Sequence, residues 1–263
     1  MSVSISNTPA SGLIEISVLV PVMNEAGNIE PLVNEICATF KDRLFEIIYI
    51  DDASTDDTPL ELASLSIKVP QLRVLRHSIQ AGQSAAIWSG LWYASGTLIG
   101  VLDGDGQNVP ADFLVLEAAL KNLGDTPGMA AGIRQQRNDS TSRLIASRVA
   151  KWIRSSLLAD THPDSGCGIK ILPRSLFFKL PYFNHMHRFM PSLVRRHGGK
   201  VLGVPVAHRP RRSGKSKYRI LDSLVVGICD VFGVIWLLRR SPKCGIVDEL
   251  SPQKQSIQKI SKT

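Results

Sequence analysis

Short apolar runs and amphipathic stretches alternate along the first half of the chain. Runs with the length and composition of buried strands lie at 16–20, 46–50, 72–75, 98–102 and 129–133. Between them, apolar residues recur with helical spacing at 28–40, from Thr58 onwards, at 82–94 and at 111–120. This alternation predicts right-handed βαβ units, and therefore an α/β fold with a Rossmann-like, mainly parallel sheet flanked by helices.

The helix that begins near residue 58 carries its own start signal. We expect Thr58 to cap it, Pro59 to occupy its first turn and Glu61 to complete a capping box.

The second half of the chain is less regular. A helix with a basic face is expected at 141–158, then a loop rich in Gly, Asp and Pro at 159–168. A further helix is expected at 190–196 and a strand at 201–206. A basic segment at 208–218 leads directly into an apolar stretch, and the polar tail from Ser241 is expected to be disordered.

Chain length, net charge and cysteine content limit the kinds of domain and binding partner that the sequence allows. The 263 residues suffice for one large α/β domain or two small ones, and the net charge of +8 predicts an anionic partner, for example nucleic acid, a membrane surface or a phosphorylated metabolite. The four cysteines are far apart and form no C-x-x-C motif, which indicates reduced thiols rather than a zinc site or disulfides. Residues 1–12 lack the features of a signal peptide, so a cytosolic setting is expected.

Carboxylates follow two of the expected strands. Asp103 and Asp105 come directly after one buried run, and Asp51 and Asp52 follow another. In parallel sheets, ligands gather at the carboxyl ends of strands, and paired hard oxygen ligands suit Mg²⁺ or Mn²⁺ on a substrate diphosphate. Taken singly, the two pairs are also compatible with a hairpin turn and a helix-capping turn.

A third loop follows the first strand. Pro21 stops the ladder there, and Asn24 and Glu25 offer polar groups at the same edge of the sheet, although an ordinary connection explains them equally well.

Several motifs occur in an order that resembles the family 2 inverting glycosyltransferases, which are GT-A fold enzymes with a metal-binding D-x-D motif. They are Val20-Pro21-x-x-Asn24-Glu25, Asp51-Asp52-Ala-Ser54-Thr-Asp56, Gly82-Gln83-Ser-Ala-Ala and Asp103-Gly-Asp105-Gly-Gln107.

Later motifs narrow this resemblance, which covers residues 14 to 240, to the polyprenyl-phosphate glycosyltransferases. Asp164-Ser-Gly-Cys-Gly168-Ile-Lys170 looks like their acceptor loop, and Arg211-x-x-Gly214-x-Ser216-Lys217-Tyr218 resembles their lipid-phosphate clamp. The acceptor motif is closer to the form in undecaprenyl-phosphate aminoarabinose-type enzymes than to that in dolichyl-phosphate mannose synthases. The Q-x-x-R-W motif of processive synthases is absent, as is a pair of long C-terminal membrane spans.

The resemblance implies a role for each matching residue. The nucleotide sugar is expected at Pro21, Asn24, Glu25, Asp52, Gly82 and Asp103, and the Mg²⁺ or Mn²⁺ ion at Asp103, Asp105 and Gln107. Arg134, after the fifth strand, is expected at the diphosphate or at an anionic part of the sugar. The lipid phosphate is expected at Lys170, Arg211, Ser216 and Lys217.

The expected chemistry stabilises a leaving group. Asp105 and Arg134 are expected to act on the departing nucleoside diphosphate, whose charge the cation neutralises. The nucleophile, a phosphate monoester with a second pKa of about 6, is largely ionised near neutral pH, so a dedicated general base is unnecessary. Asp164 is the family's candidate for that base, but we expect it to organise Lys170, Arg211 and the acceptor loop instead.

The apolar stretch at 221–238 is predicted to be an interfacial helix. At ~1.5 Å per residue it reaches roughly 27 Å, short of the ~30 Å hydrocarbon core. Asp222 and Asp230 are costly inside a bilayer, whereas Arg219, Arg239 and Arg240 suit its surface. A helix buried against the domain and a true span are the alternatives. The expected organisation is thus a flexible N-terminus (1–13), a GT-A domain (14–218), an amphipathic membrane-associated helix (219–240) and a disordered tail (241–263).

Together these features predict a metal-dependent, inverting glycosyltransferase at the cytoplasmic face of the inner membrane. We expect it to move a sugar from a nucleotide sugar, with UDP preferred over GDP, to undecaprenyl, dodecaprenyl or dolichyl phosphate, for envelope glycans such as lipopolysaccharide. Uronic acids such as galacturonate, glucose, mannose and aminoarabinose all remain open as the sugar. The alternatives are a saccharide or protein acceptor, or a non-enzymatic basic module for nucleic acid or anionic lipid. The spacing of Gly214 and Ser216 beside an apolar stretch argues against nucleic acid.

Overall fold

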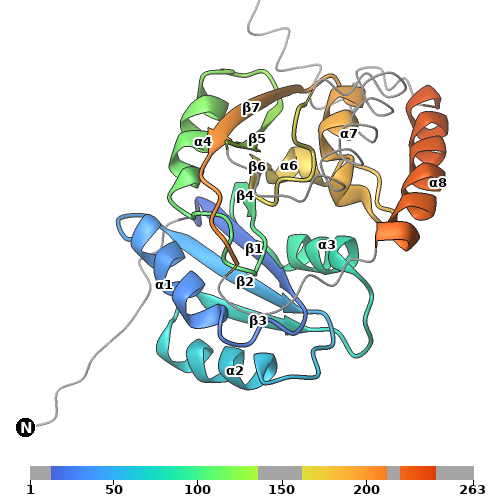
Figure 1. Ribbon diagram of the computed structural model, residues 1–263. Helices are drawn as coiled ribbons and strands as arrows, with labels where there is room; N and C mark the ends of the chain where they lie inside the picture. The colour runs from blue at the N-terminus through green and yellow to red at the C-terminus, as the bar shows by residue number, and fades with distance from the viewer. Residues whose placement is uncertain (1–12, 136–161, 212–219, 241–263) are drawn as a thin grey trace, which may run out of the picture.

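A computed structural model describes residues 13–135, 162–211 and 220–240, with the side chains of 220–229 left out. Its centre is a seven-stranded sheet with the order β3-β2-β1-β4-β6-β5-β7 (Figure 1). The strands are β1 (Ile16–Val22), β2 (Phe45–Asp51), β3 (Leu72–Arg76), β4 (Leu98–Val101), β5 (Gly128–Arg134), β6 (Lys170–Pro173) and β7 (Lys200–Val206). The mainly parallel α/β sheet expected from the hydrophobic pattern is therefore confirmed.

One strand was not expected. β6 runs antiparallel between β4 and β5, and it pairs Val101 of β4 with its own first residue, Lys170. It has only four residues and ends in a proline, so its sequence carries no recognisable strand signal. Through this strand, the segment just before it is brought beside the end of β4.

Helices cover both faces of the sheet and make a three-layer molecule. They are α1 (Ile29–Thr39), α2 (Thr58–Lys68), α3 (Gln83–Tyr93), α4 (Asp112–Lys121), α6 (Arg174–Phe177), α7 (Met190–Arg196) and α8 (Ile220–Arg239), with a short 3₁₀ turn, η1 (Met186–Arg188). α1, α2 and α4 lie on one face, and α3, α6, α7 and α8 lie on the other.

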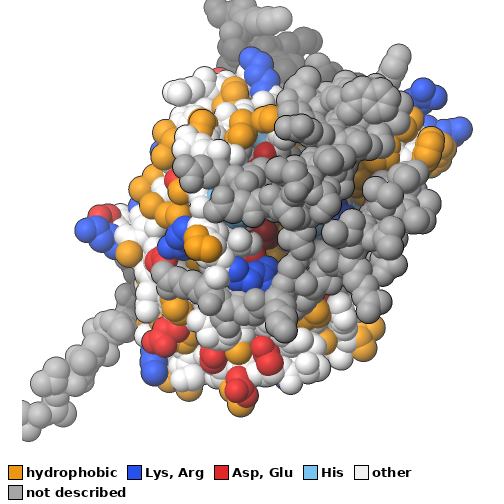
Figure 2. All heavy atoms as spheres, viewed as in Figure 1, with side chains coloured by type: hydrophobic (Ala, Val, Ile, Leu, Met, Phe, Trp, Pro, Cys, Tyr) orange, Lys and Arg blue, Asp and Glu red, His pale blue; other side chains and the backbone are white. Residues whose placement is uncertain are grey.

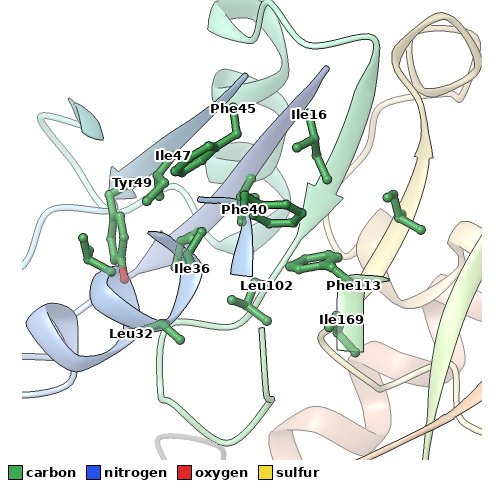
Figure 3. Packing of buried hydrophobic residues seen from close by; sticks show 14 of the residues in the cluster. Ile16, Leu32, Ile36, Phe40, Phe45, Ile47, Tyr49, Leu102, Phe113 and Ile169 are labelled. Atoms are coloured by element: carbon green, nitrogen blue, oxygen red, sulfur yellow. The ribbon is translucent and has the colours of Figure 1, made fainter. Parts of the chain in front are cut away.

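Alternation along the central strands produces these two cores. Successive strand residues point to opposite faces, so Val18 and Val20 of β1 join the cluster under α1, while Leu19 joins the cluster under α3. Figure 3 shows the first cluster, in which Phe40 at the end of α1 packs near Phe45 and Phe113. All seven residues of β2 are buried, as expected for a strand covered on both faces.

The capping box predicted for α2 is wrong. Thr58 is already inside the helix, and no side-chain capping hydrogen bond is formed. The Oγ1 atom of Thr58 instead accepts the backbone N–H of Glu25 at 2.9 Å, and the carboxylate of Glu61 accepts that of Gly27 at 2.9 and 3.0 Å. Both side chains satisfy donors of the loop after β1 rather than those of their own helix.

The apolar stretch near the C-terminus is a helix, α8, which packs against the domain. Val231 and Val234 are buried in the cluster on the α3 face, whereas Phe232 and Trp236 are 65% and 59% exposed. In the parts of the chain that the structure describes, no helix is long and apolar enough to cross a bilayer. The predicted helix at 141–158 and the predicted tail from 241 lie outside the described residues, as does the expected N-terminal segment up to residue 12.

Removing the hydroxyl group of Tyr49 is expected to stabilise the protein. Tyr49 of β2 is fully buried, and within the described residues its hydroxyl has no hydrogen-bond partner. Because an unsatisfied buried polar group costs about 1–3 kcal/mol, Tyr49→Phe should raise the free energy of unfolding in urea by about 1 kcal/mol. Phe40→Ala, which opens a cavity in the same cluster, should lower it by about 3–5 kcal/mol. A clear loss of stability in Tyr49→Phe would show that the buried hydroxyl of Tyr49 does have a hydrogen-bond partner.

Candidate active site

A cavity of about 870 Å³ lies at the carboxyl ends of β1, β2 and β4, where the sequence predicted a site. Its lining includes these predicted residues: Pro21, Glu25, Asp52, Gly82, Asp103, Asp105, Arg134, Asp164, Lys170 and Arg211. Acidic, basic and histidine side chains gather near the middle of the face seen in Figure 2. Asn24 and Gln107 do not line the cavity, and Ser216 and Lys217 lie outside the described residues.

Asp52 organises the loop that leads into α3. Its carboxylate accepts the backbone N–H groups of Ala81 and Gly82 at 2.8 and 2.7 Å, and lies 2.8 Å from Nδ1 of His77. The other ring nitrogen of His77 lies 2.9 Å from Oγ of Ser89. Gly82 has φ +90°, a conformation that side chains disfavour, at the point where this loop borders the cavity. Its neighbour Asp51 closes a turn instead, by accepting the N–H of Ser54 at 2.9 Å.

Asn24 joins two loops at the edge of the sheet. Its backbone N–H donates to Oγ of Ser54 at 2.8 Å, and its side-chain oxygen accepts the N–H of Thr55 at 2.7 Å. It has φ 52°, which asparagine tolerates better than most residues. The structure thus gives Asn24 a role in fixing loop shape, while Glu25 beside it faces the cavity.

Asp103 is a partly buried carboxylate in a mixed electrostatic environment. Burial and the neighbouring charge of Asp105 raise its pKa, and Lys170, a hydrogen bond of 2.8 Å from Gln83 Nε2 and Arg134 oppose that rise. Gly168 leaves room for this carboxylate, because a Cβ atom at that position would lie 2.1 Å from Oδ2 of Asp103. The two aspartates therefore offer hard oxygen donors at one wall of the cavity, a donor set that fits a divalent cation.

Asp105 is paired with Arg211. Their side chains meet at 2.8 Å, and Arg211 also lies 3.6 Å from Oε1 of Glu25. Gln107, predicted as the third metal ligand, directs its amide nitrogen to the carbonyl of Arg209 at 3.2 Å and donates its backbone N–H to Asp105 at 3.1 Å. Among the described residues, His, Cys, Asp and Glu form no group of three or more that could hold a metal ion. Other ligands, such as diphosphate oxygens, would have to complete the coordination shell.

Arg134 and Asp164 form a bidentate ion pair. Nε and one terminal nitrogen of Arg134 each donate to Asp164 at 2.7 Å, and the backbone N–H of Arg134 reaches the same carboxylate at 3.2 Å. Asp164 is buried. With both oxygens accepting from Arg134, Asp164 suits the organising role better than a role in proton transfer.

Lys170 is a buried ammonium group at the start of β6. It donates a hydrogen bond to the carbonyl of Cys167. Burial lowers its pKa, and the nearby groups Cys167, Asp103 and Asp164 act in the opposite direction. The pairing of Lys170 with Val101 places this cation beside the end of β4, close to Asp103.

The structure adds cavity residues that the sequence did not single out. His185 and, from the 3₁₀ turn η1, His187 and Arg188 reach the lining just before α7. Nδ1 of His187 lies 2.8 Å from Oγ of Ser84, and burial holds the pKa of His187 well below its usual value. Nδ1 of His185 lies 2.8 Å from Asp230 of α8, which links that helix to the cavity wall. These histidines belong to no recognisable local motif. Gln83 and Gly168 do lie inside the recognised motifs, but the sequence alone assigned them no role at the site.

The sequence was compared with protein families and curated proteins. The family described as Glycosyl transferase family 2 matches residues 17–178. The chain is 31% identical over 248 residues to a dodecaprenyl-phosphate galacturonate synthase from Rhizobium johnstonii, an alignment that covers 91% of the chain and 72% of that protein. It is 28% identical over 212 residues to an undecaprenyl-phosphate 4-deoxy-4-formamido-L-arabinose transferase from Sodalis glossinidius, which covers 79% of the chain. The matched region spans only 64% of that relative's length.

Among solved structures, glucosyl-3-phosphoglycerate synthase from Mycobacterium tuberculosis in complex with Mn²⁺, UDP-glucose and phosphoglyceric acid is similar. The TM-score is 0.63 at 20% identity, and the match covers 90% of this chain and 84% of the other. At this identity the comparison shows that the two chains share a fold, in agreement with the expected GT-A-like architecture.

A methyl group at Gly168 is expected to disturb the predicted cation site. In Gly168→Ala, the new Cβ must displace the carboxylate of Asp103, so Mn²⁺ binding followed by electron paramagnetic resonance should weaken by about 10–100-fold. Gly166→Ala is the matched control, because its Cβ would meet Arg134 at an ordinary 3.7 Å. Equal Mn²⁺ affinity in both variants would show that the position of Asp103 does not govern the ion.

Proposed function

Because the chain belongs to glycosyl transferase family 2, we propose that it transfers a sugar from a nucleotide-diphosphate sugar to polyprenyl phosphate. The observation that carries this proposal is a single cavity with an acidic pair, Asp103 and Asp105, and two cations, Lys170 and Arg211. The acids suit the metal-bound diphosphate of a donor, and the cations suit the phosphate of an acceptor. Two relatives named for sugar transfer to polyprenyl phosphates support the same assignment.

On the donor side, Asp103 and Asp105 would hold Mg²⁺ or Mn²⁺, and a bound ion would neutralise the charge that develops on the leaving diphosphate. The similar solved structure contains Mn²⁺ and UDP-glucose, which supports this choice of ion and nucleotide. The loops bearing Pro21, Glu25 and Asp52 would receive the nucleotide. The hydrogen bonds of Asp52 to Ala81 and Gly82 keep the floor of that pocket in place.

On the acceptor side, a phosphate oxygen of the lipid forms a bond to the anomeric carbon while the bond to the nucleoside diphosphate breaks on the opposite face. The charge of Lys170 and Arg211 would bind and orient this phosphate, with Ser216 and Lys217 as further proposed contacts. Near neutral pH the phosphate monoester, with a second pKa of about 6, is largely ionised. Asp164 is therefore free to hold Arg134 in position through their bidentate ion pair.

We propose a uronic acid, such as galacturonate, as the sugar to test first. One relative is named for galacturonate and another for a formamido-arabinose. The guanidinium of Arg188 at the cavity wall is a suitable partner for a sugar carboxylate. The product, a polyprenyl-phosphate monosaccharide, would serve as a sugar donor for envelope glycans such as lipopolysaccharide.

The lipid acceptor calls for contact with the cytoplasmic membrane surface, and the exposed aromatic residues suit a peripheral contact. On α8, Phe232 and Trp236 are exposed, and Arg240 lies over the ring of Trp236 at 5.3 Å. A second group, which we call the aromatic cluster, comprises Trp88, Trp92, Phe178 and Tyr182, with ring centroids 5.0 to 6.5 Å apart. Tryptophan and tyrosine with basic neighbours are typical of membrane–water interfaces.

Transfer into a lipid-soluble product is the test of the proposed activity. The purified chain with Mn²⁺, polyprenyl phosphate and labelled UDP-galacturonate should move label into butanol, and a panel of UDP- and GDP-sugars identifies the donor. Asp103→Asn should lose about 100-fold or more in rate, whereas exposed Asp125→Asn should not change it. Lys217→Ala should lose lipid transfer severely.

Two outcomes would replace the proposal. Transfer to a saccharide or protein that survives Lys217→Ala would indicate another acceptor. If no sugar enters any product and the only activity is binding that Asp103→Asn leaves intact, the chain is a non-enzymatic module.

Membrane contact through these aromatic residues is tested with vesicles of phosphatidylethanolamine and phosphatidylglycerol. Replacing Trp92, Phe232 and Trp236 together by serine should weaken vesicle binding at least about tenfold, because each large aromatic residue contributes about 1.5–3 kcal/mol when buried in an apolar environment. The matched control replaces Leu60 and Ile67, which are 71% and 86% exposed on α2, at the opposite side of the sheet. An equal loss of vesicle binding in the aromatic variant and in the α2 control would show that these aromatic residues are not the membrane-binding surface.

A further inference from the structure

Arg211 occupies an unusual position for a residue expected to bind an acceptor. Its guanidinium lies 2.8 Å from Asp105 and 3.6 Å from Glu25, two carboxylates on the donor side of the cavity. The three side chains are only 26%, 13% and 11% exposed. Arg211 therefore bridges the two walls of the donor pocket.

The chain just before Arg211 is held independently of this bridge. The backbone N–H of Arg209 donates to the carbonyl of Gln107 at 2.8 Å, and the guanidinium of Arg209 pairs with Glu35 at 2.9 Å. The backbones of Asn108 and His208 also pair in an isolated antiparallel β-bridge. The segment therefore stays anchored beside the end of β4 whether or not the side chain of Arg211 changes partners.

A guanidinium and a divalent cation compete for the same carboxylate oxygen of Asp105. Arginine keeps its positive charge in proteins, so Arg211 offers Asp105 a permanent counter-charge as long as the two side chains stay paired. Metal–oxygen bonds of about 2.0–2.2 Å need direct access to the carboxylate. One terminal nitrogen of Arg211 lies 2.8 Å from Oδ2 of Asp105, and Oδ1 accepts the backbone N–H of Gln107 at 3.1 Å. An ion bound at Oδ2 of Asp105 would therefore compete with Arg211 for that oxygen.

We propose that Arg211 is an exchangeable cation: it pairs with Asp105, and on leaving Asp105 when a donor binds it would become available to the phosphate of the acceptor. This inference rests on the proposed function and specifies the order in which the substrates bind, with the nucleotide sugar before the lipid phosphate. Arg211 would thus serve both half-sites in turn, first as the partner of Asp105 and then as a contact of the acceptor phosphate. The displaced guanidinium remains in the cavity, where the phosphate is the anion of complementary geometry.

The first test measures Mn²⁺ affinity by electron paramagnetic resonance, without any reaction. Arg211→Gln should bind Mn²⁺ roughly two- to tenfold more tightly than the wild type, as expected for loss of a competing, partly exposed ion pair. Arg209→Gln is the matched control, because it removes the same charge from the same segment but pairs with Glu35 rather than Asp105. Arg211→Lys, which keeps a competing charge, should stay close to the wild type. Equal or weaker Mn²⁺ binding in Arg211→Gln, or the same gain in Arg209→Gln, would overturn the proposal.

The second test measures binding of farnesyl phosphate by calorimetry, with and without Mn²⁺ and UDP. The wild type should bind this probe several-fold more tightly in the presence of Mn²⁺ and UDP, and Arg211→Gln should lose that enhancement. Identical binding under both conditions would overturn the proposed order. If farnesyl phosphate never binds and no sugar is transferred, the proposed function fails, and the Mn²⁺ titration still decides whether Arg211 competes for Asp105.

Discussion

The carboxylates of Asp103 and Asp105, one residue apart at the end of a buried strand, repel each other. Most polar side chains around them offset this repulsion. Asp103 is partly buried beside Lys170, Gln83 and Arg134, and its pKa is still raised by burial and by Asp105. Asp105 is neutralised by Arg211. Placing two carboxylates so close together lowers folding stability. It also attracts a divalent cation strongly and, through the cation, a diphosphate. The acidic pair thus explains why cations converge on this edge of the sheet.

The sheet topology brings the two halves of the site together. The donor loops follow parallel strands β1, β2 and β4, whose carboxyl ends share one edge. The acceptor loop arrives from the opposite direction, because β6 is antiparallel and pairs its first residue, Lys170, with Val101. Gly168 lies two residues earlier and fits against Asp103 only because it lacks a side chain. A single register thus determines how the lysine, the glycine and the aspartate meet.

The sequence predicts those features that depend on local pattern. The buried strands and the acidic strand ends could be predicted, because apolar periodicity and strand-end carboxylates are local signals. Other residues of the cavity lining, such as Lys170 and Arg211, were expected only from the resemblance to a known family. β6 could not, since four residues ending in proline carry no such signal. The capping box failed because Thr58 and Glu61 found partners in another loop. The contact of His185 with Asp230 joins residues 45 positions apart, and no local pattern encodes it.

The central claim is that Asp103 and Asp105 form the cation site through which the donor diphosphate is held. Anomalous diffraction from crystals soaked with Mn²⁺ and UDP tests it most directly. The account predicts one manganese peak between the carboxylates of Asp103 and Asp105 and the diphosphate, with Arg211 turned away from Asp105. A manganese peak elsewhere in the cavity, or bound UDP with Arg211 still paired to Asp105 and no ion between them, would contradict it.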